Sequence, residues 1–175
     1  FTTTGGIIVG STKTDEQGIG SVQLISADPK PFDAKYGLGA GFAEIEARTS
    51  DENLNVITDR IIVLFSGVPG ITINPTSFDI PNAGQQQFDY TVMDQNQNPL
   101  AGGTRISVDV AGDDAGLLGD VSFNLPDTQS PLWTQFRFIL YDTKPDTTKL
   151  VPVGLSIVTE GPNGRASVTI TGHKR

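Results

Sequence analysis

Short stretches in which apolar and polar residues alternate recur along the whole chain. Phe88, Tyr90 and Val92 belong to one such stretch, and Ile106 and Val108 belong to the next. Because alternate side chains of a strand point to opposite faces, this pattern predicts strands that cover a core on one side. In the second part of the chain it predicts strands at residues 78–80, 88–92, 106–110, 117–121, 133–141, 151–158 and 166–171.

Turn-forming pairs separate these stretches, among them Pro81-Asn82, Asn98-Pro99 and Gly102-Gly103. Short strands with a turn roughly every 8–12 residues are typical of an aligned antiparallel β-sandwich, and no amphipathic helix pattern interrupts them. The inward-facing residues form the predicted core, which consists of Phe88, Tyr90, Val92, Ile106, Val108, Phe136, Phe138, Leu155, Ile157, Val168 and Ile170.

An internal repeat divides the chain. Residues 60–67 align with residues 165–172, and residues 19–25 align with residues 133–139, where both predicted strands precede an Asp-x-Lys-Pro tetrapeptide. The repeat predicts residues 68–175 as a complete sandwich module and residues 1–67 as the C-terminal half of another. The short junction Ser66–Gly70 contains a proline, so we expect it to restrict rotation between the modules.

The incomplete first module is expected to have an uncovered core face. It lacks counterparts of the early strands, which should cover its inward residues Val22, Leu24, Ile45, Val63 and Phe65. Bare apolar faces and open strand edges recruit other chains. We therefore expect residues 1–67 to be completed by strand-sharing self-association, by a retained upstream fragment or by packing against the second module.

Composition and charge narrow the class of protein. The 20 glycines and 11 prolines fit many turns between short strands. A net charge of −8 repels a phosphate backbone, so nucleic acid is not an expected partner. The longest strongly apolar run, Ile61–Phe65, is far shorter than the roughly 20 residues of a bilayer-spanning helix, so we expect no membrane insertion by this fragment. Because the chain has no cysteine, disulfides and thiol chemistry are excluded.

Two segments carry a resemblance to a known family. Residues 90–102 are similar to a valine-containing strand that runs into an Asp-x-x-Gly-x-Pro turn, with Gln97 at the glycine position. Residues 14–24 begin Thr-Asp-Glu-Gln-Gly and resemble a second such turn before an alternating strand. The chain thus resembles bacterial immunoglobulin-like domains of the invasin and intimin type. The resemblance implies an all-β fold of tandem immunoglobulin-like antiparallel β-sandwiches, the first incomplete, in an extracellular or cell-surface bacterial protein.

Residues suited to catalysis are few. His173 is the only histidine, so no Ser-His-Asp or multi-histidine arrangement can form, and a structural role or a loose tail is expected for it. Glu44 and Glu46 lie on the same polar side of a predicted strand, where a solvated face is favoured over a catalytic pair. We therefore do not expect an enzyme.

Two acidic stretches make calcium the one cofactor worth considering. Residues 94–98 have the ligand spacing of a calcium loop, but Pro99 and Arg105 replace the residues that complete one, which favours a hairpin turn. A denser group could relieve its mutual repulsion by binding Ca²⁺, with a plain acidic loop as the alternative. This group consists of Asp109, Asp113, Asp114 and Asp120.

Trp133 is the single tryptophan and falls out of phase with Phe136 and Phe138. We expect it on the outer side or at the entry of its strand, where it is a candidate contact for carbohydrate, with packing at the rim as the alternative.

Two functions from different classes fit these observations. The first is a non-catalytic stalk, spacer or adhesion module of a secreted or surface-anchored bacterial protein, with a protein or glycan at the cell surface as its partner. The alternative is an accessory carbohydrate-binding or linker module of a secreted polysaccharide-degrading enzyme.

Overall fold

The computed structural model describes residues 1–112, 114–146 and 149–175. The chain divides into unit 1, Phe1–Phe65, and unit 2, Ser66–Arg175. Each unit is described by itself. The repeat predicts a boundary at position 67.

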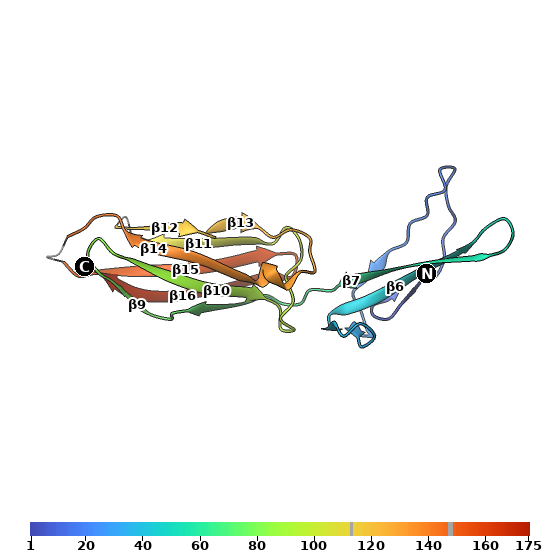
Figure 1. Cartoon of the computed structure of the whole chain (residues 1–175), viewed down its shortest axis with the longest axis horizontal. Coiled ribbons are helices and arrows are strands. Elements are labelled where there is room, and N and C mark those ends of the chain that lie inside the picture. Colours follow the sequence, from blue (N-terminus) through green and yellow to red (C-terminus); the bar gives the residue numbers. More distant parts are fainter. Residues whose placement is uncertain (113, 147–148) are drawn as a thin grey trace. The chain divides into compact units, whose positions relative to one another are not determined.

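Unit 2 is built from two layers of strands (Figure 1). One sheet has the order β12-β14-β10-β8, with the strands Ala115–Gly119, Gln135–Asp142, Gln85–Met93 and Gly70–Asn74. The other has the order β13-β11-β15-β16-β9, with Ser122–Asn124, Arg105–Ala111, Val151–Gly161, Gly164–Lys174 and Phe78–Ile80.

The topology of unit 2 is that of an immunoglobulin-like sandwich. β8 and β9 follow one another in the chain but belong to different sheets, and β9 pairs in parallel with the end of β16. The other pairings are antiparallel. The all-β class is therefore confirmed. β8 and β13 are strands that the alternation pattern did not predict.

The predicted core of unit 2 is also confirmed. Ten of the eleven predicted residues are buried, and Val168 is partly buried against them. Aromatic rings fill its centre: Phe88 and Phe138 stack with centroids 5.0 Å apart, and Phe78 meets Phe88 edge-on at 5.4 Å. The phase of each strand is fixed because a slip by one residue would turn these rings out to solvent.

Unit 1 contains one sheet of the order β1-β6-β7, formed by Thr2–Thr3, Phe42–Ser50 and Val56–Leu64. Two further ladders are short. β2 (Ile7–Ile8) pairs with β3 (Leu24–Ile25), and β4 (Phe32–Asp33) pairs with β5 (Gly39–Ala40). Within this unit, whose residues are all described, Phe42 and Ala43 are the buried apolar residues.

The predicted strand at residues 19–25 is wrong for most of its length. Only Leu24 and Ile25 are in a strand, and the preceding residues are irregular. The segment of unit 2 that aligns with it in sequence, β14, is hydrogen-bonded on both sides, to β10 and to β12. β3 pairs with β2 alone. The Ile19 carbonyl accepts from the Asp15 amide and Gly20 lies beside residues 12–14, but no strand lies on the other side of the segment, so no ladder extends along it.

Three aspartates open turns of the same construction. In each, a side-chain oxygen accepts hydrogen bonds from the amides two and four residues later, at 2.8–3.0 Å. The aspartates are Asp15, Asp51 and Asp94. The fourth residue of each turn has left-handed backbone dihedrals, with φ of 79° at Gly18, 64° at Leu54 and 67° at Gln97. The Asp-x-x-Gly pattern is thus a turn in which the glycine position requires positive φ.

Replacing Gln97 with glycine is expected to stabilise unit 2 by about 0.5–1 kcal/mol. Relief of the left-handed backbone, worth about 1–2 kcal/mol, exceeds the roughly 0.4–1 kcal/mol lost through the extra freedom of the unfolded chain. Denaturant unfolding measures the change. Asn96→Gly is the control, because it lies in the same turn without positive φ and should lose stability; equal effects of both changes would contradict this explanation.

Candidate functional site

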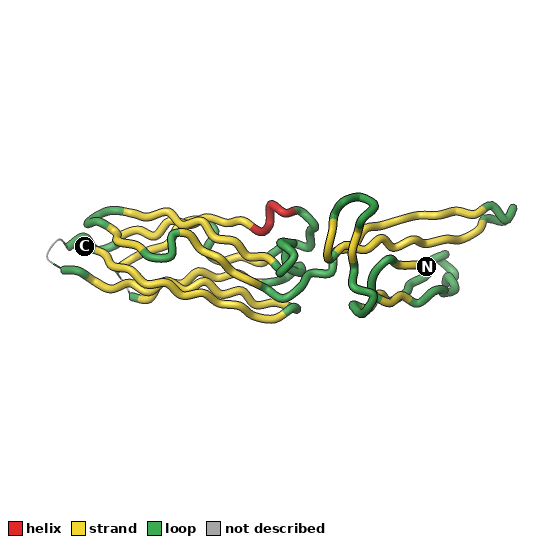
Figure 2. Tube along the Cα trace, turned by 90° about the horizontal axis from the view of Figure 1, so that it is seen from below, coloured by secondary structure: helices red, strands yellow, loops and turns green. Residues whose placement is uncertain are grey.

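Trp133 lies in a hollow on unit 2. A 3-10 turn at Pro131–Thr134, red in Figure 2, precedes β14 and holds the indole at the strand's entry, 40% exposed. The hollow has a volume of about 350 Å³. It combines Trp133 and Phe123 with the polar side chains of Ser122, Asn124 and Asp120. The placement at the strand entry is confirmed, and the aromatic ring does have polar neighbours.

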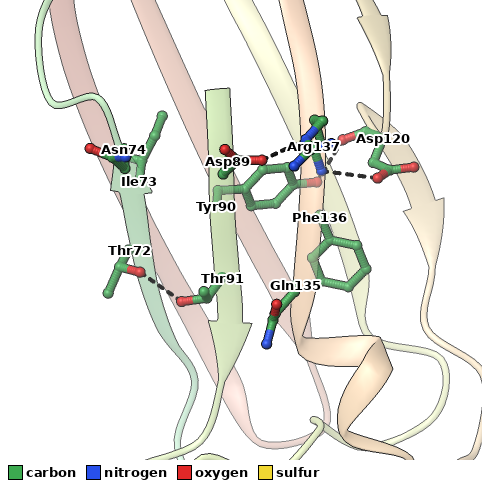
Figure 3. A pocket seen from close by; sticks show the side chains of 10 residues that line it. All are labelled: Thr72, Ile73, Asn74, Asp89, Tyr90, Thr91, Asp120, Gln135, Phe136 and Arg137. Atoms are coloured by element: carbon green, nitrogen blue, oxygen red, sulfur yellow. Dashed lines mark hydrogen bonds and ion pairs between the residues drawn. The ribbon is translucent and has the colours of Figure 1, made fainter. Parts of the chain in front are cut away.

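A second hollow, of about 430 Å³, lies over β8, β10 and β14 (Figure 3). Its outward side chains are paired with one another: Asp89 with Arg137 at 2.6 Å, and the hydroxyls of Thr72 and Thr91 at 2.7 Å. Beneath them, the Tyr90 hydroxyl donates to the Asp120 carbonyl at 2.6 Å, and burial raises the pKa of this phenol. The outer rim of this hollow thus consists of an exposed ion pair and a pair of hydrogen-bonded hydroxyls.

The described aspartates of the predicted calcium group do not lie close enough together to bind one ion. Asp114 and Asp120 flank β12, so about 20 Å of strand separates them. Asp114 pairs with Lys144 at 3.2 Å, and a carboxylate oxygen of Asp120 accepts from the Arg137 amide at 3.0 Å. Asp109 lies on β11, in the other sheet, and Asp113 lies outside the described residues. Over residues 1–112, 114–146 and 149–175, no three Asp, Glu or His side chains form a group that could hold a metal ion.

The calcium-like spacing at residues 94–98 belongs to a turn. Asp94 is buried, and its oxygens accept from the amides of Asn96, Asn98 and Gly67 at 2.8–2.9 Å. The turn is not a hairpin as predicted, because β10 and β11 lie in different sheets.

The interpretation of Glu44 and Glu46 as a solvated face is wrong in one respect. Both do point to the same side of β6, but their side chains are only 14% and 10% exposed. Basic residues cover them: Lys35 bonds Glu44 at 2.6 Å, and Arg48 and Arg60 bond Glu46. These hydrogen bonds lower the pKa of both carboxyl groups, which favours ion pairing over acid–base catalysis.

His173 is not in a loose tail. It lies in β16 opposite Asp79 of β9, and its Nδ1 is 3.5 Å from the Asp79 carboxylate. The expected loose tail is therefore wrong, and a structural role for His173 stays a prediction.

Sequence reasoning missed a buried ion pair at the end of unit 2. Lys174 donates to Asp142 at 2.6 Å and to the Lys144 carbonyl at 2.7 Å, and their side chains are 3% and 0% exposed. The Asp142 carboxylate also accepts from the amides of Ala83 and Lys144. The Asp-x-Lys-Pro repeat marks Asp142, but nothing in the sequence links it to Lys174.

Comparison with known proteins gives similarities of structure only. No family model and no curated protein matches the sequence. A structure of domains 1–6 of the surface layer protein SbsC has a TM-score of 0.43 at 16% identity, covering 90% of this chain and 18% of that one.

Two further structures are similar at this level. A complex of Dpr2 Ig1-Ig2 with DIP-Theta Ig1-Ig3 has a TM-score of 0.42 at 10% identity, covering 77% of this chain and 41% of that one. A β-glycosidase from Bacteroides vulgatus has a TM-score of 0.36 at 18% identity, covering 87% and 19%. This chain thus spans less than a fifth of the SbsC chain and of the glycosidase. The invasin and intimin type is not confirmed. In the described residues, no helix is long and apolar enough to span a bilayer.

Proposed function

We propose that the chain is a non-catalytic, immunoglobulin-like module of a secreted or surface-anchored bacterial protein, where it acts as a stalk or spacer. The surface layer protein among its structural neighbours is compatible with this location. The observation that supports a spacer is the construction of the junction between the units.

The junction contains no free linker. The Phe65 amide donates to the Gly41 carbonyl at 2.8 Å, so unit 1 is held to its last residue. The next residue, Ser66, already belongs to unit 2: its hydroxyl donates to the Pro99 carbonyl at 2.8 Å, and its carbonyl accepts from Asn163. The Gly67 amide donates to Asp94 at 2.9 Å. A junction tethered on both sides supports restricted rotation, which a spacer needs in order to project what it carries.

Spin labels in the two units test the spacer. Because the chain has no cysteine, Glu52→Cys and Ser167→Cys place one label at an exposed position in each unit. We expect a narrow distance distribution between the labels. A Gly-Ser linker inserted between Phe65 and Ser66 is the control and should broaden it. An equally broad distribution without the insertion would reject the spacer function.

A glycan contact is the second candidate function, favoured by the Trp133 hollow. An indole beside Ser122 and Asn124 offers a stacking surface next to hydrogen-bonding groups, which is the combination that sugar rings require. Trp133→Ala is expected to weaken glycan binding at least tenfold, about 1.4 kcal/mol, as measured on an array of glycans. Leu132→Ala is the matched control, because Leu132 is 82% exposed and does not line the hollow. No binding by the unmodified chain would reject this candidate.

A further inference from the structure

Unit 1 repeats half of unit 2 in the same register. In unit 2, one row across the sheet joins Arg105, Glu160 and Arg165. In unit 1, the corresponding row joins Thr2, Glu46 and Arg60. β1, β6 and β7 are thus the counterparts of β11, β15 and β16, and the β2–β3 ladder corresponds to the β12–β14 pair. Unit 1 has no counterpart of β8, β9 or β10.

The sheet of unit 1 has two unlike faces. Residues paired directly across strands share a face. On one face lie Glu44, Glu46 and Arg60, neutralised by their ion pairs. The other face carries the pairs Ala43–Val63, Ile45–Ile61, Ala47–Asp59 and Thr49–Ile57, so it is apolar except for Asp59. This second face corresponds in register to the face of unit 2 that the other sheet covers.

The apolar face is incompletely covered. Ile57 and Ile61 are 54% and 61% exposed. By the same register, Ile61 corresponds to Ala166 of unit 2, which is partly buried, and the partly buried Ile45 corresponds to Thr159, which is 0% exposed because the sheet β12-β14-β10-β8 covers that face. Unit 1 has only the two-residue strands β2 and β3 in that position, with exposed Ile7 and Ile25.

We propose that unit 1 is an acceptor for extended strands of the kind that β8–β10 supply in unit 2. One of them pairs with β3 and lays its apolar side chains on the face of Ile45 and Ile61. Its chemistry is that of β10, in which Phe88, Tyr90 and Val92 alternate with polar residues. This partner is not part of the spacer function proposed above. The sequence itself supports the acceptor. Residues 19–25 alternate like a strand, but no strand lies on the side of this segment that faces away from β2.

The occupant is a segment joined to β1, not a second copy of the chain. In unit 2, β10 leads into β11 through residues 94–104, and β1 is the counterpart of β11. A β10-like strand placed ahead of β1 would therefore enter at the right end. A second copy has no such segment to give, because its own β8, β9 and β10 are paired within unit 2.

A chimera tests the acceptor. A second copy of residues 70–103 is placed directly before Phe1, the counterpart of Thr104. We expect amide hydrogen exchange to slow at least tenfold at the alternate amides of residues 20–25 that point away from β2, since these amides would pair with the added strand. The control chimera has serine in place of Phe88, Tyr90 and Val92 in the added copy only, and should show no slowing. Exchange in β15 and β16 shows in each protein that unit 2 is folded.

Two results would overturn the proposal. One is exchange in residues 19–25 that is unchanged in the chimera, or slowed equally in both chimeras. The other is concentration-dependent dimerisation of the unmodified chain, seen by sedimentation, with residues 57–61 protected only in the dimer, which would assign the face to a second copy. The spin-label experiment addresses the junction alone, so failure of the acceptor leaves the spacer function standing.

Discussion

Truncating Phe138 to alanine is expected to lower the free energy of unfolding of unit 2 by about 3–5 kcal/mol. Phe138 is 1% exposed. Its ring stacks on that of Phe88 with centroids 5.0 Å apart, and its centroid lies 5.7 Å from that of the Tyr90 ring. Its removal therefore leaves a cavity between the two sheets that backbone ladders on both sides keep from closing. Denaturant unfolding followed by Trp133, the single tryptophan, reports on this unit alone.

Leu118→Ala is the control for this experiment. Leu118 lies on the neighbouring strand β12 but is 58% exposed, so its truncation should cost less than about 1 kcal/mol. Equal losses for the two variants would mean that burial does not govern the effect, and would contradict the packing described for the core.

The core of unit 2 could be predicted from the sequence because it depends on a local pattern. The alternation of Phe88, Tyr90 and Val92 is visible within five residues, and it fixes which face is buried whatever the partner strand is. β8 and β13 were missed because three to five residues, with Gly70 in one of them, show too little alternation. Which residues of a strand face the core can thus be predicted without knowing the topology, whereas the arrangement of the two sheets cannot.

Most of the polar sites could not be predicted in the same way, because strand pairing brings their residues together from separate segments of the chain. Asp89 meets Arg137 only through the register of β10 and β14. Glu44 and Glu46 were placed on the correct side of their strand. The residues that cover them include Lys35, from a loop, and Arg60, from β7, and the sequence does not show that these lie nearby. The ion pairs of such residues can be predicted only when the strand pairing is known.

The irregular residues 19–23 show a different limit of sequence reasoning. Their alternation is a property of the segment, whereas a strand is a property of two segments. Strand propensity depends on neighbours more than helix propensity does, so a correct pattern gave a wrong element where the strand on one side is missing. The same residues are those in which the chimera should restore the predicted strand.

Replacing Lys174 with methionine is expected to destabilise unit 2 by about 3–5 kcal/mol at neutral pH. The methionine retains most of the apolar stem, so packing changes little, but Asp142 is left as a buried charge without its cation. The amides of Ala83 and Lys144 still donate to it, which keeps the loss within this range. The matched control is Lys144→Met, whose ion pair with Asp114 is largely exposed and should contribute less than about 1 kcal/mol.

The pH dependence separates loss of the ion pair from loss of packing. Burial alone would raise the pKa of Asp142, but the hydrogen bonds from Lys174 and the two amides hold it below its usual value. A lowered carboxyl pKa contributes stability above the unfolded value of about 4, and this contribution disappears as the pH falls through the folded value. Without Lys174 the pKa of Asp142 rises, so the variant takes up a proton at higher pH than the unmodified protein. The difference in unfolding free energy should therefore be largest near pH 7 and narrow as the pH approaches 4, whereas a packing defect would give the same difference at both.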